Sequence, residues 1–125
     1  MVDDEPDILE LLREWLLLEG YDVWVAQDCH EFHRLAFDTK PDLIILDIML
    51  GRENGVSVYN RLVNQGLDSS IPVIFITGLA HDRPESPAIP GRTYALRLKP
   101  FNPYEIVKDI RCLVGPQDEQ SAEVA

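Results

Sequence analysis

Short apolar runs alternate along this chain with longer segments in which apolar residues recur at helical spacing. The runs with the length and composition of buried β-strands are 23–26, 43–46, 73–76 and 95–98. The segments with helical spacing are 7–19, 31–38, 55–65 and a last helix after residue 102. Strands that alternate with helices predict an α/β fold, in which helices cover both faces of a parallel sheet.

The last helix has the clearest start signals, because Asn102 is a preferred N-cap and Pro103 suits the first helical position. Each helix also has an apolar stripe that we expect to face the sheet. These stripes are Ile8, Leu12, Trp15 and Leu16; Phe32, Leu35 and Ala36; Val58, Tyr59, Leu62 and Val63; and Ile106, Ile110, Leu113 and Val114.

The first strand is unusually short, since only Met1 and Val2 precede three successive acidic residues. Strands commonly have about five residues, and this one is expected in the middle of the sheet. We therefore expect the numbering to begin inside the strand, with preceding residues absent. If Met1 is the true terminus, the fold is expected to be weak.

The crossover between the last two strands contains three prolines, Pro84, Pro87 and Pro90. Each proline removes a backbone donor and disfavours a continuing helix. The sequence predicts a short helical turn at 79–82 followed by an extended, polyproline-like loop in place of a full fourth helix.

The length and composition narrow the class of protein. The 125 residues suit one domain, here 1–114, and the polar residues 115–125 read as a tail or linker. A net charge of −11 argues against direct nucleic-acid binding. No apolar run could span a membrane, and no signal peptide is visible. With Cys29 and Cys112 interpreted as reduced thiols, these features predict a cytoplasmic domain.

Five polar residues follow the ends of the expected strands. They are Asp3 and Asp4, Asp47, Thr77 and Lys99. Taken singly, each has an ordinary explanation as a turn former, a helix cap or a solvated strand end. However, the carboxyl ends of parallel strands meet at one edge of a sheet, where ligands of open α/β folds bind. Because all five residues are expected at that edge, a functional site there is favoured.

The residue types suggest phosphoryl transfer. Three crowded carboxylates need a counter-charge, and Mg²⁺ prefers such oxygen ligands. Lys99 offers a second positive charge and Thr77 a neutral donor, both suited to phosphoryl oxygens, while Asp47 could attack phosphorus. Glu5, next to the acidic pair, is expected to favour the start of the first helix.

The segments "VDDEP", "LIILDIMLGRENG", "VIFITG" and "LKPFNPYEI" together resemble the receiver domain of two-component response regulators. This resemblance extends from Val2 to Val114. It implies a flavodoxin-like, three-layer, doubly wound fold with five parallel strands in the order 2-1-3-4-5. It also implies a signalling domain that phosphorylates and dephosphorylates itself, rather than a turnover enzyme.

The resemblance assigns a role to each matching residue. Asp47 would be the phosphoacceptor, and Thr77 and Lys99 would contact the phosphoryl group. Mg²⁺ would be bound by Asp4 directly, by Asp3 through water, by Asp47 and by the backbone carbonyl of Met49. The donor would be a phosphohistidine on a sensor histidine kinase or a histidine phosphotransfer protein. An effector domain after the tail and a single-domain relay both stay open.

The sequence departs from the family pattern at three places. Gly51 replaces the usual proline, which should loosen the loop after Asp47, and Leu96 replaces the usual aromatic switch residue. The proline-rich crossover is the third departure, and together they predict an altered output surface. Separately, Leu11 and Leu18 lie on one side of the first helix and are expected to dock a partner, which the family resemblance suggests is a kinase.

Three other functions compete with this interpretation. A phosphatase of the haloacid-dehalogenase type would need a second Asp where Met49 stands, and a cap domain that the length does not allow. A pseudo-receiver that acts only as a binding module usually lacks some of the five site residues, which are all present here. A flavin-binding domain would need a Ser/Thr/Gly-rich phosphate loop after the first strand.

Overall fold

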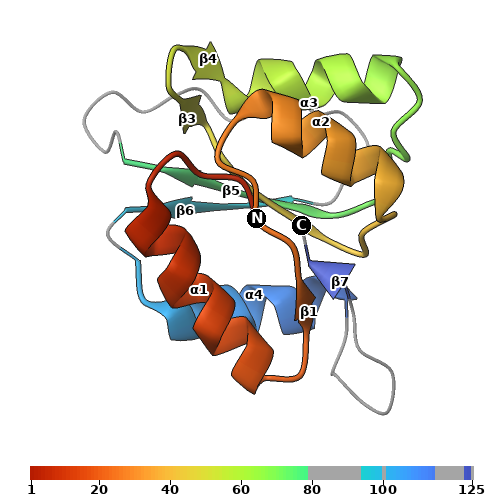
Figure 1. Ribbon diagram of the computed structural model, residues 1–125. Helices are drawn as coiled ribbons and strands as arrows, with labels where there is room; N and C mark the ends of the chain where they lie inside the picture. The colour runs from red at the N-terminus through yellow and green to blue at the C-terminus, as the bar shows by residue number, and fades with distance from the viewer. Residues whose placement is uncertain (79–93, 100, 115–122, 125) are drawn as a thin grey trace.

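The computed structural model describes residues 1–78, 94–99, 101–114 and 123–124. Its helices are α1 (Pro6–Leu18), α2 (Cys29–Asp38), α3 (Gly55–Asn64) and α4 (Pro103–Val114). Its strands are β1 (Asp22–Val23), β2 (Ile44–Asp47), β3 (Met49–Leu50), β4 (Glu53–Asn54), β5 (Val73–Thr77), β6 (Tyr94–Leu98) and β7 (Glu123–Val124). In Figure 1, α2 and α3 lie on one face of the sheet, and α1 and α4 lie on the other.

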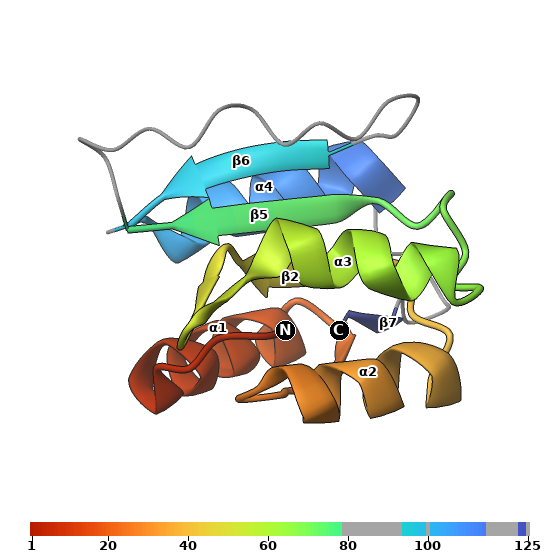
Figure 2. The same cartoon turned by 90° about the horizontal axis from the view of Figure 1, so that it is seen from above.

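The sheet is parallel, and its order agrees with the prediction. Strands β2, β5 and β6 are hydrogen-bonded in that order and run in one direction, as Figure 2 shows for β5 and β6. Val2 forms parallel bridges to both Ala26 and Leu46. The short first strand at residues 1–2 therefore lies between the segment that contains β1 and strand β2. When it is counted as strand 1, with β1, β2, β5 and β6 as strands 2 to 5, the order is 2-1-3-4-5.

Two apolar cores form, one on each face of the sheet. On one face, Phe32 of α2 and Tyr59 of α3 pack with Phe75 of β5, and the rings of Tyr59 and Phe75 meet edge to face. On the other face, Leu12 and Leu16 of α1 pack with Ile106 and Ile110 of α4. This double burial explains why β2 and β5 are continuous apolar runs rather than alternating ones.

The buried stripe of α1 differs from the prediction, because Trp15 is 38% exposed and Leu9 is buried instead. Leu9, Leu12 and Leu16 fall within one narrow sector of the helix. At about 100° per residue, Trp15 lies roughly 60° from Leu12, on the side that also carries Leu11. Trp15 therefore stands at the border of the buried stripe.

Other boundaries also differ from the sequence expectations. The strand expected at 23–26 is reduced to β1 and a separate bridge at Ala26. The hairpin of β3 and β4 and the pairing of β7 with β1 were not predicted. The helical turn at 79–82 and the loop after it lie outside the described residues. Among the described residues, no helix has both the length and the apolar character needed to cross a membrane.

The amino end of the chain is enclosed by the sheet. Met1 is 1% exposed, and its ammonium group donates a hydrogen bond to the carbonyl oxygen of Trp24 at 2.6 Å. Farther along the chain, Glu123 and Val124 of β7 pair with β1.

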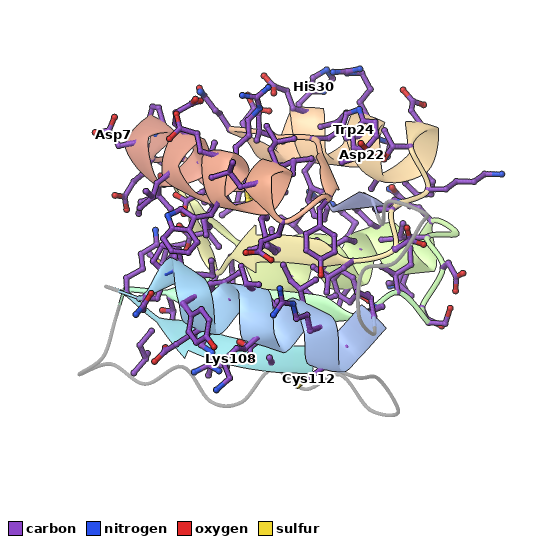
Figure 3. All side chains as sticks on the ribbon, turned by 90° about the horizontal axis from the view of Figure 1, so that it is seen from below. Asp7, Asp22, Trp24, His30, Lys108 and Cys112 are labelled. Carbon is purple, nitrogen blue, oxygen red and sulfur yellow. The ribbon has the colours of Figure 1, made fainter. Side chains whose placement is uncertain are left out.

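The two cysteines come from different helices and are both free thiols, as expected. Cys29 opens α2 and is partly buried, and burial raises the pKa of its thiol to about 12. Cys112 is exposed on α4 and is labelled, with Lys108, in Figure 3. The raised pKa makes Cys29 a poor nucleophile at neutral pH.

Candidate functional site

The fold brings all five predicted site residues to one edge of the sheet. Asp47 and Thr77 end β2 and β5, and Lys99 follows β6. The backbone amide of Asp47 donates to the carbonyl of Val2 at 2.9 Å, so Asp3 and Asp4 follow directly beside it. The amide of Lys99 donates to the carbonyl of Thr77 at 2.7 Å. Parallel pairing therefore sets the positions of these side chains.

The polar residues of the site differ in exposure. Asp3 and Asp47 are 3% and 2% exposed, and Thr77 is fully buried. Asp4, in contrast, is exposed. Burying a carboxylate is unfavourable unless the charge has partners. The partners of Asp3 and Asp47 therefore indicate whether this edge is a functional site.

The ammonium group of Lys99 lies among three carboxylates. Its Nζ is 2.9 Å from Asp3 Oδ2, 2.9 Å from Asp47 Oδ2 and 3.0 Å from Glu5 Oε1. The Lys99 side chain is itself only 13% exposed. One cation therefore balances two buried acids and one acid at the rim, which leaves the site with excess negative charge.

The pKa values reflect this arrangement. Burial raises the pKa of Asp47 to about 6, and the nearby charge of Asp3 adds to the increase. The bonds from Lys99 and from the amide of Met49 oppose it. For Lys99, burial would lower the pKa, but its bonds to the three carboxylates together raise it above its ordinary value. Lys99 therefore stays charged at neutral pH.

Oxygen atoms from Asp3, Asp4 and Asp47 lie within 4.8 Å of one another. Hard divalent cations prefer clustered carboxylate oxygens, and Asp3 and Asp47 have only Lys99 as a nearby counter-charge among the described residues. This set of donors fits Mg²⁺. Met49 donates its amide to Asp47 Oδ1 at 2.9 Å, and its carbonyl as a metal ligand stays a prediction.

Gly51 has two defined roles that the sequence did not predict. It opens the two-residue turn between β3 and β4 with φ +59°, a left-handed conformation that glycine adopts freely. Its amide donates to Asp4 Oδ2 at 3.1 Å. Proline could neither adopt this φ nor donate this bond. Glycine at position 51 therefore holds Asp4, in addition to any loosening of the loop.

The start of α3 packs closely against the backbone that follows β2. The side chain of Asn54 accepts hydrogen bonds from the amides of Val56 and Ser57, and so caps the helix. Gly55 donates its amide to the carbonyl of Ile48 at 2.6 Å. A Cβ atom at Gly55 would lie 2.2 Å from the carbonyl oxygen of Asp47. Only glycine fits against this backbone.

Sequence reasoning did not assign three residues that the structure places in the site: Glu5, Gly51 and Gly55. The run of three successive acids was a usable signal for Glu5, which was expected only to start α1. Gly55 was noted as part of the motif after Asp47, but its close approach to Asp47 depends on how α3 packs. The bond from Gly51 to Asp4 joins residues 47 positions apart and leaves no local signal.

Comparison with known proteins identifies the family. Residues 1–111 match the sequence model of the response regulator receiver domain. The chain is 31% identical over 124 residues to the phosphate regulon transcriptional regulatory protein PhoB of Pseudomonas aeruginosa, covering 97% of this chain and 54% of that protein. It is 32% identical over 114 residues to the alkaline phosphatase synthesis transcriptional regulatory protein PhoP of Bacillus subtilis, covering 91% and 47%.

Solved structures support the same assignment. The response regulator TrrA of Thermotoga maritima, in complex with Mg²⁺ and BeF, has a TM-score of 0.71 and 32% identity, covering 90% of this chain and 94% of that one. A CheY-like receiver domain from Methanospirillum hungatei has a TM-score of 0.79 at 24% identity, covering 90% and 89%, which supports the fold alone.

The chain belongs to the response regulator receiver domain family. It is a receiver domain, a module of two-component signalling rather than a turnover enzyme. The expected α/β fold and the acidic cluster suited to Mg²⁺ are confirmed. The chain spans about half the length of the curated relatives it matches.

Proposed function

We propose that this domain accepts a phosphoryl group on Asp47 from a phosphohistidine donor, with Mg²⁺ held by Asp3, Asp4, Asp47 and the carbonyl of Met49. One observation carries the proposal: the carboxylate of Asp47 is buried, bonded to Lys99, and within 4.8 Å of two further carboxylates. A structural aspartate would gain nothing from such crowding. A phosphoacceptor benefits, because cations gathered for these acids also neutralise an incoming phosphoryl group.

Each residue contributes a separate part of the chemistry. Asp47 attacks phosphorus, and the donor nitrogen leaves with the electron pair of the broken P–N bond. Lys99 pairs with a phosphoryl oxygen, and the hydroxyl of Thr77 at the end of β5 donates to another. When bound, Mg²⁺ supplies positive charge to the phosphoryl oxygens. The donor is a sensor histidine kinase or a histidine phosphotransfer protein, and the domain acts in the cytoplasm.

The test is incubation with acetyl phosphate and Mg²⁺, followed by intact mass measurement. The expected result is a gain of one phosphoryl group that requires Mg²⁺. Reduction with borohydride converts an aspartyl phosphate to homoserine, and peptide mapping should place that residue at position 47. No gain of mass would instead favour a binding module that works without phosphorylation. Rapid release of phosphate from simple phosphomonoesters would favour the phosphatase alternative.

A docking surface for the donor is proposed on α1. Leu11, Trp15 and Leu18 are 45%, 38% and 88% exposed, and their spacing places them on one side of the helix. Next to this stripe is a mainly apolar hollow lined by Ile8, Leu11 and Phe101, which reaches Lys99 of the phosphoacceptor site. A donor bound to the stripe would therefore have its phosphohistidine close to Asp47.

Leu11→Asp is expected to slow phosphotransfer from a phosphorylated histidine phosphotransfer domain at least about tenfold, because it places a charge in an apolar contact. Phosphorylation by acetyl phosphate should be unchanged. Leu17→Asp is the matched control, since Leu17 is 44% exposed but points about 120° away from Leu11 around α1. Transfer rates from both donors are followed by mass. An equal loss with both donors would reject the docking role.

The output of the domain is proposed to differ from that of typical receivers. Leu96, in the position of the usual aromatic switch, is 38% exposed on β6. Its neighbour Arg97 is bonded to Asp109 of α4 at 2.5 and 2.7 Å, which ties the strand to the helix. In a longer protein, as in the DNA-binding relatives, an effector domain after the tail would receive the signal.

A further inference from the structure

Glu5 lies at the boundary between the phosphoacceptor site and the proposed docking hollow. It lines the depression that contains Asp4, Asp47 and Lys99, and it also lines the hollow that contains Ile8, Leu11 and Phe101. Its side chain is 59% exposed, whereas those of Asp3 and Asp47 are only 4% and 3% exposed. Of the three carboxylates bound to Lys99, Glu5 is therefore the one that an incoming phosphodonor meets first.

The Lys99 ammonium group is enclosed by three carboxylates, because Asp47 and Glu5 accept hydrogen bonds from it at 2.9 and 3.0 Å and Asp3 Oδ2 forms an ion pair with it at 2.9 Å. A phosphoryl oxygen can pair with Lys99 only if one of these partners gives way. The carboxylates of Asp3 and Asp47 are enclosed by the sheet edge, whereas the side chain of Glu5 is exposed and free to turn away from Lys99. Glu5 is therefore the partner that phosphoryl binding must displace.

A cation in the metal site would not neutralise the negative charge of Glu5. The cluster that could hold a cation consists of Asp3, Asp4 and Asp47 and does not include Glu5. Once Lys99 turns to the phosphoryl group, the carboxylate of Glu5 lies beside the site without that partner. It repels a donor that carries only negative charge, and it attracts a donor whose leaving group is positive.

We propose that Glu5 is a specificity-determining residue, which disfavours phosphodonors with an anionic leaving group and favours those with a cationic one. This inference rests on the proposed phosphorylation of Asp47. With acetyl phosphate, the new bond joins Asp47 to phosphorus, and acetate leaves with the electrons of the P–O bond. With phosphoramidate, the P–N bond breaks and the protonated nitrogen leaves as ammonia. A phosphohistidine resembles the second case, since its ring can carry a positive charge.

The test compares Glu5→Gln with the parent, using acetyl phosphate and phosphoramidate in separate reactions with Mg²⁺. The expected result is a rate with acetyl phosphate that rises about threefold to tenfold, because a nearby like charge is removed. The rate with phosphoramidate should rise less or fall, so the ratio of the two rates changes. Because Glu5 is exposed, the change should shrink at high salt.

Glu10→Gln is the matched control, because it makes the same charge change on α1, where Glu10 faces Arg13 instead of Lys99. Its two rates should equal those of the parent. Glu5→Lys should shift the ratio further in the same direction as Glu5→Gln. An unchanged ratio in both Glu5 variants would overturn the inference. A parent protein that neither donor phosphorylates would instead overturn the proposed function.

Discussion

Asp47→Asn is expected to abolish phosphorylation and, without Mg²⁺, to make the domain more stable at pH 7. The asparagine cannot act as the nucleophile, so the gain of mass with acetyl phosphate should disappear. Stability should rise because Asp47 is ionised at pH 7 in a buried position beside Asp3. The free energy of unfolding, measured with urea in the presence of EDTA, should increase by about 1–3 kcal/mol.

The sign of this stability change follows from the pKa of Asp47 in the folded and unfolded states. The folded-state pKa of Asp47 is about 6, above its ordinary value of 3.8, so the folded protein binds this proton more tightly than the unfolded chain. Above pH 6 the ionised carboxylate costs its full penalty, and below about pH 4 the penalty is gone. The advantage of the Asn variant should therefore shrink between pH 6 and pH 4.

Mg²⁺ provides an independent check on the same site. Adding it should stabilise the parent more than the Asn variant, which has lost one of the three clustered carboxylates. A variant that is less stable than the parent at pH 7 would contradict the prediction. It would show that the bond from Lys99 outweighs burial and repulsion at Asp47.

Gly55→Ala is expected to destabilise the domain by about 2–3 kcal/mol, because overpacking forces the surrounding backbone to move. The added Cβ would lie 2.2 Å from the carbonyl oxygen of Asp47 and 3.1 Å from Cα of Ile48. Both atoms belong to the backbone, so no side-chain rotation can relieve the contact. Urea unfolding measures the loss, and the displaced Asp47 should also be phosphorylated more slowly.

Gly78→Ala is the control for this prediction. Gly78 also lies at the carboxyl edge of the sheet, but a Cβ there would meet only the side chain of Lys99, at 3.8 Å. That distance is an ordinary van der Waals contact, so stability should change by less than about 0.5 kcal/mol. Equal stability of the Gly55 variant and the parent would show that α3 moves away from Asp47 without cost.

The family resemblance was the strongest part of the sequence evidence, and it covered the motifs that surround the site. Strands β2, β5 and β6 were predicted to within one residue, because continuous apolar runs are required when both faces of a sheet are covered. The strand expected at 23–26 was predicted less well, since Ala26 alone makes the expected pairing, to Val2, while Asp22 and Val23 pair with β7. Edge positions receive less burial and so carry a weaker apolar pattern.

Amphipathic spacing predicted the existence of each helix but not all of its buried residues. Trp15 fits the apolar stripe of α1 by residue type, yet it stands at the border of the stripe and is partly exposed. Which large side chain faces the core depends on the rotation of the helix against the sheet. That rotation is set by contacts with α4 and the strands, which are distant in sequence.

By itself, the sequence determined the alternation of strands and helices, the family, and the five residues that meet at the sheet edge. These depend on local apolar patterns and on the rule that parallel strands end on the same side. Only the tertiary structure decided that Lys99 has Glu5 as a third partner, that Gly51 holds Asp4, and that Gly55 touches the backbone of Asp47. Such contacts depend on distances and angles between elements, which the pattern of residues along one strand or helix does not specify.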